Sequence, residues 1–293
     1  MKFKPDRKRL VLLAALAALG IALAAAPSAG AEPGKQKYIL ALGDSETAGT
    51  QAIAPAVVLG GSPETEVNRS GSGYADQLAA TLEGRGLRAD LVNLACYYET
   101  TETMIDGGGL CSYPHGSQLD EAEQFLHAHG EDVRAVVMSI GANDMLRSCA
   151  FLDSVCYADR LAVAGANLAA ILGRLRAEAA DVPIAIVNYH NPFLALWFQS
   201  PLFAQLTVPG IVLPLAQMIA AASAPYGVVV VDTLSTFETE NFTDVRPLPP
   251  FGDVPVNVWN ICVYTWMCTH IDIHPNTAGY GLMAEAVARA LGF

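Results

Sequence analysis

Three short motifs carry the residues of this sequence whose types could do chemistry together. Gly43-Asp44-Ser45 and Gly141-Ala142-Asn143-Asp144 each follow an apolar run, and Asp272-Ile273-His274 stands near the C-terminus. A serine can act as a nucleophile, a histidine as its base, and an asparagine side chain as a hydrogen-bond donor to a developing oxyanion. These residues are the parts of an acyl-transfer site.

The elements that must position these motifs are short apolar runs separated by longer helical patterns. Such runs are typical of parallel strands that are buried on both faces. We predict strands over Tyr38–Leu42, Leu91–Leu94, Ala135–Ile140, Pro183–Asn188 and Val228–Val231. We predict helices over Tyr74–Glu83, Leu119–His129, Asp159–Ala180, part of Pro214–Ala222, and Ala278–Leu291.

Alternating strands and helices predict an α/β fold, with a central parallel sheet of about five strands and helices on both faces. In such sheets ligands bind at the carboxyl ends of the strands, so the three motifs could converge there. Residues 50–72 and 236–269 fit no regular element, and we expect them to form walls or lids of a substrate cleft.

The N-terminal residues have the pattern of an export signal. Basic residues precede an apolar stretch, and the small residues Ala29-Gly30-Ala31 form a cleavage site. An uncleaved membrane anchor is the alternative, but the small residues and the proline after them favour cleavage. We therefore expect a signal peptide over residues 1–31, and a single secreted domain over residues 32–293 that does not insert stably into a membrane. Residues 194–224 are the next most apolar stretch, but prolines and glutamines interrupt them.

The charge balance excludes some partners. The formal net charge is −12 at pH 7, and the predicted signal peptide holds five basic residues and one acidic residue, so the mature chain is more acidic still. This acidity argues against nucleic acids and anionic membranes as main partners. We expect a monomer that acts on a small molecule or a lipid.

An even number of cysteines in an exported chain predicts disulfides. We favour the three sequential pairs, because each encloses one loop. A zinc site is the competing interpretation, but the spacings are irregular and the sequence contains no C-x-x-C motif. The expected pairs are Cys96–Cys111, Cys149–Cys156 and Cys262–Cys268.

Taken together, the motifs resemble the SGNH (GDSL) hydrolase family. Ala41-Leu42-Gly43-Asp44-Ser45 is similar to its first block, Ile140-Gly141-Ala142-Asn143-Asp144 to its third, and Asp272-Ile273-His274-Pro275-Asn276 to its last. Cys96, Glu99-Thr100-Thr101 and Gly116-Ser117-Gln118-Leu119 further resemble a secreted bacterial branch with three disulfides. The resemblance implies a flavodoxin-like three-layer α/β/α fold, no cofactor, and hydrolysis of carboxylic esters.

The resemblance also implies roles for individual residues. Ser45 would be the nucleophile, and its backbone N–H one oxyanion donor. Asn143 would be a second donor through its side chain. His274 would take the proton from Ser45 and later give it to the leaving alcohol.

The sequence departs from the family pattern at two positions. Tyr98 stands where the family usually has a glycine; its N–H could still serve the oxyanion hole, but its side chain should resist a positive φ and crowd the cleft. The family's acid precedes the histidine by three residues, where this chain has Ile271. Asp272 could orient His274 instead, because residues two apart on an extended segment share a face. A backbone carbonyl is the alternative.

His270, Asp272 and His274 also form an H-x-D-x-H pattern that looks like a metal triplet. No second cluster of ligands accompanies it in the sequence, so we predict no metal.

We therefore expect a secreted serine esterase or lipase. Large apolar residues could line an acyl pocket, which would favour acyl or lipid esters; the alternative is that they are core packing. A carbohydrate O-acetyl esterase, or a catalytically weak exported binding protein on the same fold, are the alternative functions. The apolar residues are Phe193, Leu194, Trp197, Phe198, Leu202, Phe203, Ile211, Leu213, Trp259, Tyr264 and Trp266.

Overall fold

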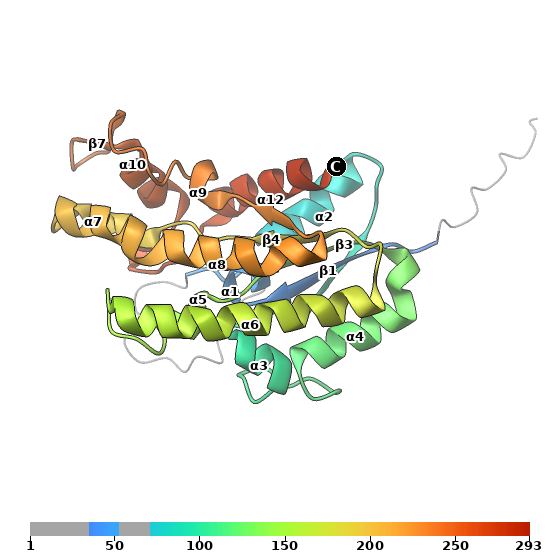
Figure 1. The fold of residues 1–293 in the computed structure, drawn as a ribbon. Coiled ribbons are helices and arrows are strands. Elements are labelled where there is room, and N and C mark those ends of the chain that lie inside the picture. The colour runs from blue at the N-terminus through green and yellow to red at the C-terminus, as the bar shows by residue number, and fades with distance from the viewer. Residues whose placement is uncertain (1–34, 53–70) are drawn as a thin grey trace, which may run out of the picture. The chain divides into compact units, whose positions relative to one another are not determined.

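The computed structural model describes residues 35–52 and 71–293. Residues Gln36–Phe293 form one compact unit (Figure 1). The predicted signal peptide, and most of the first irregular region, lie outside the described residues.

The centre of this unit is a parallel sheet in the strand order β2-β1-β3-β4-β5. Its strands match the five predicted ones within a few residues. The alternation of side chains supplies two cores, because Leu40 and Leu42 of β1 pack on one face of the sheet and Ile39 and Ala41 on the other. The strands are β1 (Tyr38–Gly43), β2 (Asp90–Asn93), β3 (Val133–Ser139), β4 (Ile184–Val187) and β5 (Val229–Val231).

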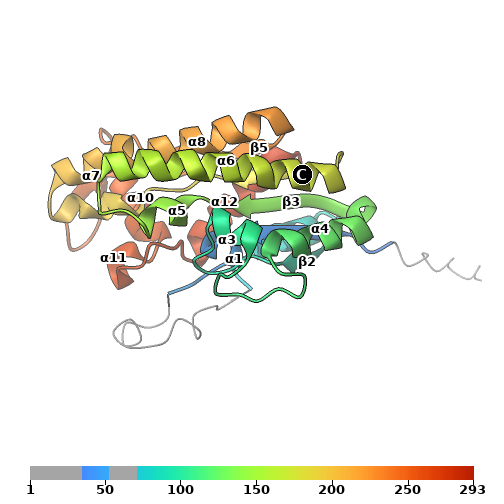
Figure 2. The same ribbon diagram turned by 60° about the horizontal axis from the view of Figure 1, so that its bottom comes forward.

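Helices cover both faces of the sheet, which gives the three layers that the sequence predicts. One face is covered by α4 (Gln118–His129), α6 (Ser154–Glu178) and α8 (Leu213–Ser223), with α6 and α8 side by side (Figure 2). The other face is covered by α2 (Tyr74–Gly84), α10 (Val256–Tyr264) and α12 (Thr277–Leu291) (Figure 1). The expected flavodoxin-like α/β/α class is thereby confirmed.

Shorter elements complete the unit, many of them at the carboxyl ends of the strands. The short α-helices are α1 (Ser45–Ala48), α3 (Thr101–Asp106), α5 (Ala142–Leu146), α7 (Pro201–Thr207), α9 (Thr233–Thr236) and α11 (Met267–His270). The 3₁₀ and π turns are η2 (Gly130–Asp132), η3 (Pro192–Phe198), η4 (Val208–Val212) and η5 (Ala224–Tyr226).

The prediction that residues 236–269 fit no regular element is wrong. They hold the antiparallel pair β6 (Val245–Pro247) and β7 (Asp253–Pro255), followed by α10 and α11. The prolines that suggested a loop end at Pro255, directly before α10 begins. Val258 and Ile261 of α10 are then fully buried, and this packing stabilises the helix.

The interrupting prolines also misled the interpretation of the apolar stretch near residue 200. Ser154–Glu178 and Pro201–Tyr226 are helical and apolar enough, by length and composition, to cross a membrane. Prolines at the first turn of a helix are tolerated, so α7 and α8 form despite Pro201 and Pro214. Both stretches bury one face in the core, as the core helices of soluble domains do.

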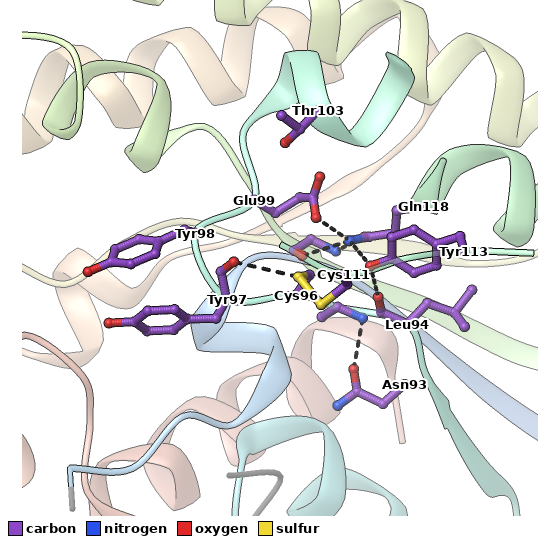
Figure 3. The surroundings of a disulfide bond; sticks show 12 residues. Asn93, Leu94, Cys96, Tyr97, Tyr98, Glu99, Thr103, Cys111, Tyr113 and Gln118 are labelled. Atoms are coloured by element: carbon purple, nitrogen blue, oxygen red, sulfur yellow. Dashed lines mark hydrogen bonds between the residues drawn. A yellow bond between two sulfur atoms is a disulfide. The ribbon is translucent and has the colours of Figure 1, made fainter. Parts of the chain in front are cut away.

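The six cysteines form three disulfides with the sequential pairing: Cys96–Cys111, Cys149–Cys156 and Cys262–Cys268. The first lies beside the carboxyl ends of β1 and β2, surrounded by the polar side chains drawn in Figure 3.

Candidate active site

The serine of the first motif stands at a sharp exit from the sheet. β1 ends at Gly43 with φ 105°, and a Cβ there would lie 2.0 Å from the carbonyl oxygen of Ser139. No larger residue fits that approach, which explains the glycine of the motif. The N–H of Asp44 donates to the same carbonyl at 2.8 Å, and α1 begins at Ser45.

Gln118 holds this exit from the side of the disulfide (Figure 3). Its Oε1 accepts from the Gly43 N–H at 2.5 Å, and its Nε2 donates to the Gly43 carbonyl at 3.1 Å. The side chain is fully buried at the start of α4. In the sequence Gln118 is visible only as a landmark of the resemblance, because the partner of a buried amide cannot be predicted from composition.

The residue before the serine is also held from a distant strand. Tyr189, which follows β4, donates its hydroxyl to Asp44 Oδ2 at 2.5 Å, and the Glu46 N–H donates to Asp44 Oδ1 at 3.0 Å. Burial, and then the neighbouring charge of Glu46, raise the pKa of Asp44 well above its ordinary value. Sequence reasoning missed Tyr189, for which no local signal exists.

The structure brings Ser45, His274 and Asp272 into one chain of hydrogen bonds. His274 Nε2 lies 2.8 Å from Ser45 Oγ, and His274 Nδ1 lies 2.7 Å from Asp272 Oδ1. A carboxylate only accepts, so Nδ1 carries the ring proton and Nε2 is left as the acceptor for the serine hydroxyl. Asp272 Oδ1 also accepts from the His274 backbone N–H at 2.8 Å.

The environment keeps Asp272 in the charged form that this arrangement needs. Burial acts to raise its pKa, but the hydrogen bonds that it accepts from His274, together with the electrostatic contributions of His274 and His270, outweigh burial and hold the pKa below its ordinary value. The group beside Nδ1 was expected to be either the Asp272 carboxylate or a backbone carbonyl, and in the structure it is the carboxylate. Two residues of spacing suffice because Asp272 folds back onto its own loop.

That loop is attached along its backbone to the segment that carries the third disulfide. The Trp266 N–H donates to the His274 carbonyl at 3.0 Å, and the Asn276 N–H donates to the Tyr264 carbonyl at 2.9 Å. Tyr264 and Trp266 lie between the bonded Cys262 and Cys268, so both hydrogen bonds attach the His274 loop to the segment that this disulfide closes. The loop that carries the histidine is thus aligned by a closed covalent ring.

Asn143, in the turn after β3, reaches the same site. Its Nδ2 donates one hydrogen to the Glu99 carbonyl at 3.0 Å, which leaves the second hydrogen of the amide for another acceptor. The neighbouring Asp144 accepts from the N–H and hydroxyl of Thr101. Asn143 and Asp144 therefore connect the turn after β3 to the segment that follows β2.

Tyr98 lies in that segment and adopts the left-handed conformation of the glycine it replaces, with φ 63°. The predicted resistance to positive φ does not prevent this backbone conformation. Its ring is 37% exposed, and the Arg147 guanidinium lies 4.8 Å from the ring centroid. Arg147 also donates to the Tyr98 carbonyl at 3.0 Å. Figure 3 shows both Tyr97 and Tyr98 directed away from the disulfide.

The two backbone N–H groups that the sequence predicts for the oxyanion hole have no protein acceptor in the described part of the chain. Among the residues that the structure describes, neither the Ser45 N–H nor the Tyr98 N–H donates a hydrogen bond to the protein. With the second hydrogen of Asn143, these are the three donors that the sequence predicts for the oxyanion hole. An oxyanion hole needs donors of this kind that are already oriented and unpaired.

A pocket opens directly beside these groups. Its polar lining includes Ser45, Asn143 and His274, together with Asp44, Glu46, Tyr189 and His190. Tyr98 does not line it, so the expected crowding by that side chain is not seen. The apolar part consists of Ala142, Met145, Leu146, Pro192, Phe193, Ile211, Val212, Leu215 and Ile273.

The two interpretations of the apolar residues each hold for a part of them. Phe193 and Ile211 line the pocket. Leu194 is fully buried in the core, and Trp197 and Trp259 pack against that core. The sequence did not distinguish these groups, because Phe193, Leu194 and Trp197 follow one another in η3, and only the fold decides which of them meets the pocket.

The H-x-D-x-H pattern does not gather around a common point. His274 is directed to Ser45, whereas His270 Nδ1 lies 2.8 Å from the Thr269 hydroxyl, with its ring against Trp266. Among the described residues, no group of three or more histidine, cysteine or acidic side chains is placed to hold a metal ion.

Comparisons with solved structures place this fold among known esterases. A putative GDSL-like lipase from Parabacteroides merdae aligns over 88% of this chain and 96% of its own, with 15% identity and a TM-score of 0.53. The lipase Lip_vut3 from a goat rumen metagenome aligns over 88% and 98%, with 18% identity and a TM-score of 0.53. Axe2, an acetylxylan esterase from Geobacillus stearothermophilus, aligns over 88% and 94%, with 17% identity and a TM-score of 0.50.

At these identities the structural likeness establishes the fold alone. A comparison with curated protein sequences finds no match. The sequence profile of the GDSL-like Lipase/Acylhydrolase family, however, matches residues 41–282, which include all three motifs. The chain belongs to the GDSL-like lipase/acylhydrolase family and is a carboxylic ester hydrolase.

Proposed function

We propose that this protein is an exported serine esterase or lipase that hydrolyses acyl or lipid esters through Ser45, His274 and Asp272. The observation that carries the proposal is the chain of hydrogen bonds from Asp272 through His274 to Ser45, at 2.7 and 2.8 Å, which ends at the mouth of an apolar pocket.

In the first half of the reaction, Ser45 Oγ attacks the ester carbonyl while His274 Nε2 takes its proton. Asp272 stabilises the resulting imidazolium and keeps its Nδ1–H directed at the carboxylate. The imidazolium then protonates the leaving alcohol, and an acyl-serine remains. In the second half, water attacks the acyl-serine with His274 again as the base, which releases the acid.

The negative charge that develops on the carbonyl oxygen would be bound by the N–H groups of Ser45 and Tyr98 and by the Asn143 side chain. The bond from Asn143 to the Glu99 carbonyl fixes the amide before substrate arrives. Donors fixed in advance need no reorganisation during the reaction, which makes them effective.

The apolar wall of the pocket supports an acyl group of several carbons as the preferred substrate. Met145, Phe193 and Leu215 offer it hydrocarbon surface, and each buried CH₂ contributes about 0.8 kcal/mol. An acetyl group would use little of this surface. The proposal therefore favours acyl and lipid esters over acetylated carbohydrates.

Export is part of the proposal. It is supported by the signal-like N-terminal sequence and by the placement of all six cysteines in disulfides, which persist in oxidising compartments. We also propose that the mature protein is a monomer. N-terminal sequencing of protein from the medium of an expressing bacterium should begin after Ala31, and light scattering should give the monomer mass.

The catalytic proposal is tested with p-nitrophenyl esters from acetate to palmitate, and with a serine-reactive phosphonate. We expect kcat/KM to rise from acetate to a medium chain, and mass spectrometry to locate one phosphonate adduct on Ser45. Ser45→Ala is the control for labelling. A preference for acetate would favour the acetyl-esterase alternative, and no hydrolysis and no adduct would support a binding protein. EDTA should leave the rate unchanged; a rate restored by added metal would contradict the proposal.

A further inference from the structure

A buried histidine that the proposed mechanism does not use lines the same pocket as Ser45 and His274. His190 follows β4 and is 2% exposed, and its ring stacks on Phe237 with the centroids 5.1 Å apart. Glu46, the residue after the serine, is 6% exposed. Burying a carboxyl group or an imidazole without a polar partner is costly, so each of them needs one.

The two ring nitrogens of His190 face two different segments of the active site. Nε2 lies 2.9 Å from the carbonyl oxygen of Ile273, and Nδ1 lies 3.1 Å from Oε1 of Glu46. A carbonyl only accepts, so Nε2 carries a proton. Nδ1 and the Glu46 carboxyl group face each other at the second contact.

The contact between His190 Nδ1 and Glu46 is an ion-pair approach without the alignment of a hydrogen bond. Within residues 35–52 and 71–293, neither Nδ1 nor Glu46 Oε2 makes a hydrogen bond. The interaction between these two groups is therefore what compensates their burial.

The two residues that His190 contacts are chain neighbours of the proposed nucleophile and base. Glu46 directly follows Ser45, and Ile273 directly precedes His274. His190 thus connects the backbone beside the nucleophile to the backbone beside the base. This connection is separate from the hydrogen bond between Ser45 and His274 themselves.

We propose that His190 and Glu46 are a positioning pair that sets the distance between Ser45 and His274. The inference rests on the proposed function, because it concerns the same site. The need for such a pair is evident from the loop of His274, where Ile271 is 84% exposed and Ile273 is 37% exposed. A displacement of about 1 Å in a catalytic group can cost ~10²-fold in rate.

The first test compares two substitutions of the histidine. His190→Phe keeps an aromatic ring against Phe237 but removes both polar contacts. His190→Gln retains a side-chain N–H that can reach the Ile273 carbonyl. With a p-nitrophenyl ester that the wild type hydrolyses, we expect His190→Phe to lower kcat by about tenfold or more with KM changed less than about twofold, and His190→Gln to recover most of that loss.

The second test asks whether the two residues act as one unit. Glu46→Leu should lower kcat to a similar extent, and the double variant with His190→Phe should be no slower than the slower single variant. The matched control is Phe237→Leu, which removes packing from the same imidazole but leaves its polar contacts. That control should lower the melting temperature while kcat stays within about twofold of the wild type.

The outcomes separate this inference from the proposed function. Ser45→Ala should be inactive, and if it hydrolyses the ester as well as the wild type does, the proposed function fails. If Ser45→Ala is inactive but His190→Phe keeps wild-type kcat, only the positioning pair is overturned. It is also overturned if the losses of the two single variants multiply in the double variant, or if Phe237→Leu lowers kcat as much as His190→Phe does.

Discussion

The two halves of the active site are supported in different ways. The nucleophile stands in the interior: Ser45 is 8% exposed, Gln118 binds both backbone groups of Gly43, and Tyr189 binds Asp44. The base, His274, is itself 4% exposed, but it stands on a loop whose neighbouring residues reach the surface: the Asp272 side chain is 26% exposed and Ile271 84%. One half is fixed by the core, and the other mainly by contacts of its own loop.

This difference predicts how each half responds to substitution. Supports of the nucleophile are buried polar groups, so removing one leaves unsatisfied partners and costs about 1–3 kcal/mol of stability. Apart from the buried His190, the supports of the base belong to the partly exposed loop and to the segment beside it, so removing one should change the rate more than the stability. Substitutions within the triad test the proposed chemistry. Substitutions of the surrounding residues test whether the two halves are supported in different ways.

The largest effect is expected from Ser45→Ala or His274→Ala. Either removes the nucleophile–base unit, and in an unrelated serine protease the loss of one such member costs ~10⁶ in kcat. We expect hydrolysis of p-nitrophenyl esters to fall to the background rate, with circular dichroism and melting temperature close to the wild type. Retained hydrolysis in either variant would remove that residue from the mechanism.

Asp272→Asn should have the next largest effect. The carboxamide can donate to Nδ1 and thereby favour the wrong imidazole tautomer, a change that costs ~10⁴ in a serine protease. The variant should keep its melting temperature, since the substitution is nearly isosteric and the side chain is partly exposed. A loss below about tenfold in kcat, or ~1.4 kcal/mol in the barrier, would leave Ser45 and His274 as a dyad with Asp272 in a minor role.

Asn143→Ala should cost less than the triad variants. Removal of one oxyanion donor typically lowers kcat by ~10²–10³. Because the Asn143 amide also binds the Glu99 carbonyl, we expect some loss of thermal stability together with the loss of rate. Kinetics and a melting curve on the same preparation measure both. An unchanged kcat would mean that the N–H groups of Ser45 and Tyr98 suffice.

Gln118→Ala tests the buried half of the comparison. It leaves the N–H and carbonyl of Gly43 without their side-chain partner, so we expect a destabilisation of about 1–3 kcal/mol. Denaturant unfolding should show this loss, and kcat should fall by less than for Asn143→Ala. A fully stable variant with a collapsed rate would contradict the view that the core fixes the nucleophile.

The sequence predicts those secondary-structure elements whose formation depends on the local pattern of apolar residues. The five buried strands are continuous apolar runs, and β1 through β5 lie where those runs are. The motifs of Ser45 and Asn143 are likewise visible, because they follow β1 and β3, whereas the motif of His274 follows the short helix α11 and not a strand. In contrast, α10 lies in a region whose prolines suggested a loop, and only its tertiary packing through Val258 and Ile261 makes it a helix.

The site shows the same division. The serine, asparagine and histidine are recognisable from their motifs, and the structure brings them together. The supports are not recognisable, because Gln118 and Tyr189 act across 75 and 145 positions of the chain on Gly43 and Asp44. Nor could the sequence choose between Asp272 and a backbone carbonyl, since that choice depends on how the loop folds back.

The smallest expected effect comes from removing a disulfide. Two disulfides of similar span can be compared, one next to the His274 loop and one away from it. Cys262–Cys268 and Cys149–Cys156 close loops of 6 and 7 residues, so their removal should cost similar stability, about 2 kcal/mol by loop-closure entropy. Only the first belongs to the segment that aligns His274. Replacing both cysteines of each pair by alanine therefore gives a matched comparison.

We expect the two double variants to lose similar thermal stability, while only the variant at 262 and 268 loses activity, by about three- to tenfold in kcat. Thermal unfolding and ester hydrolysis measured below both melting temperatures give the two readouts. Mass mapping of the unreduced wild type should first show the three sequential pairs. Equal losses of kcat in the two variants would show that the base loop is no more dependent on its local ring than on the fold as a whole.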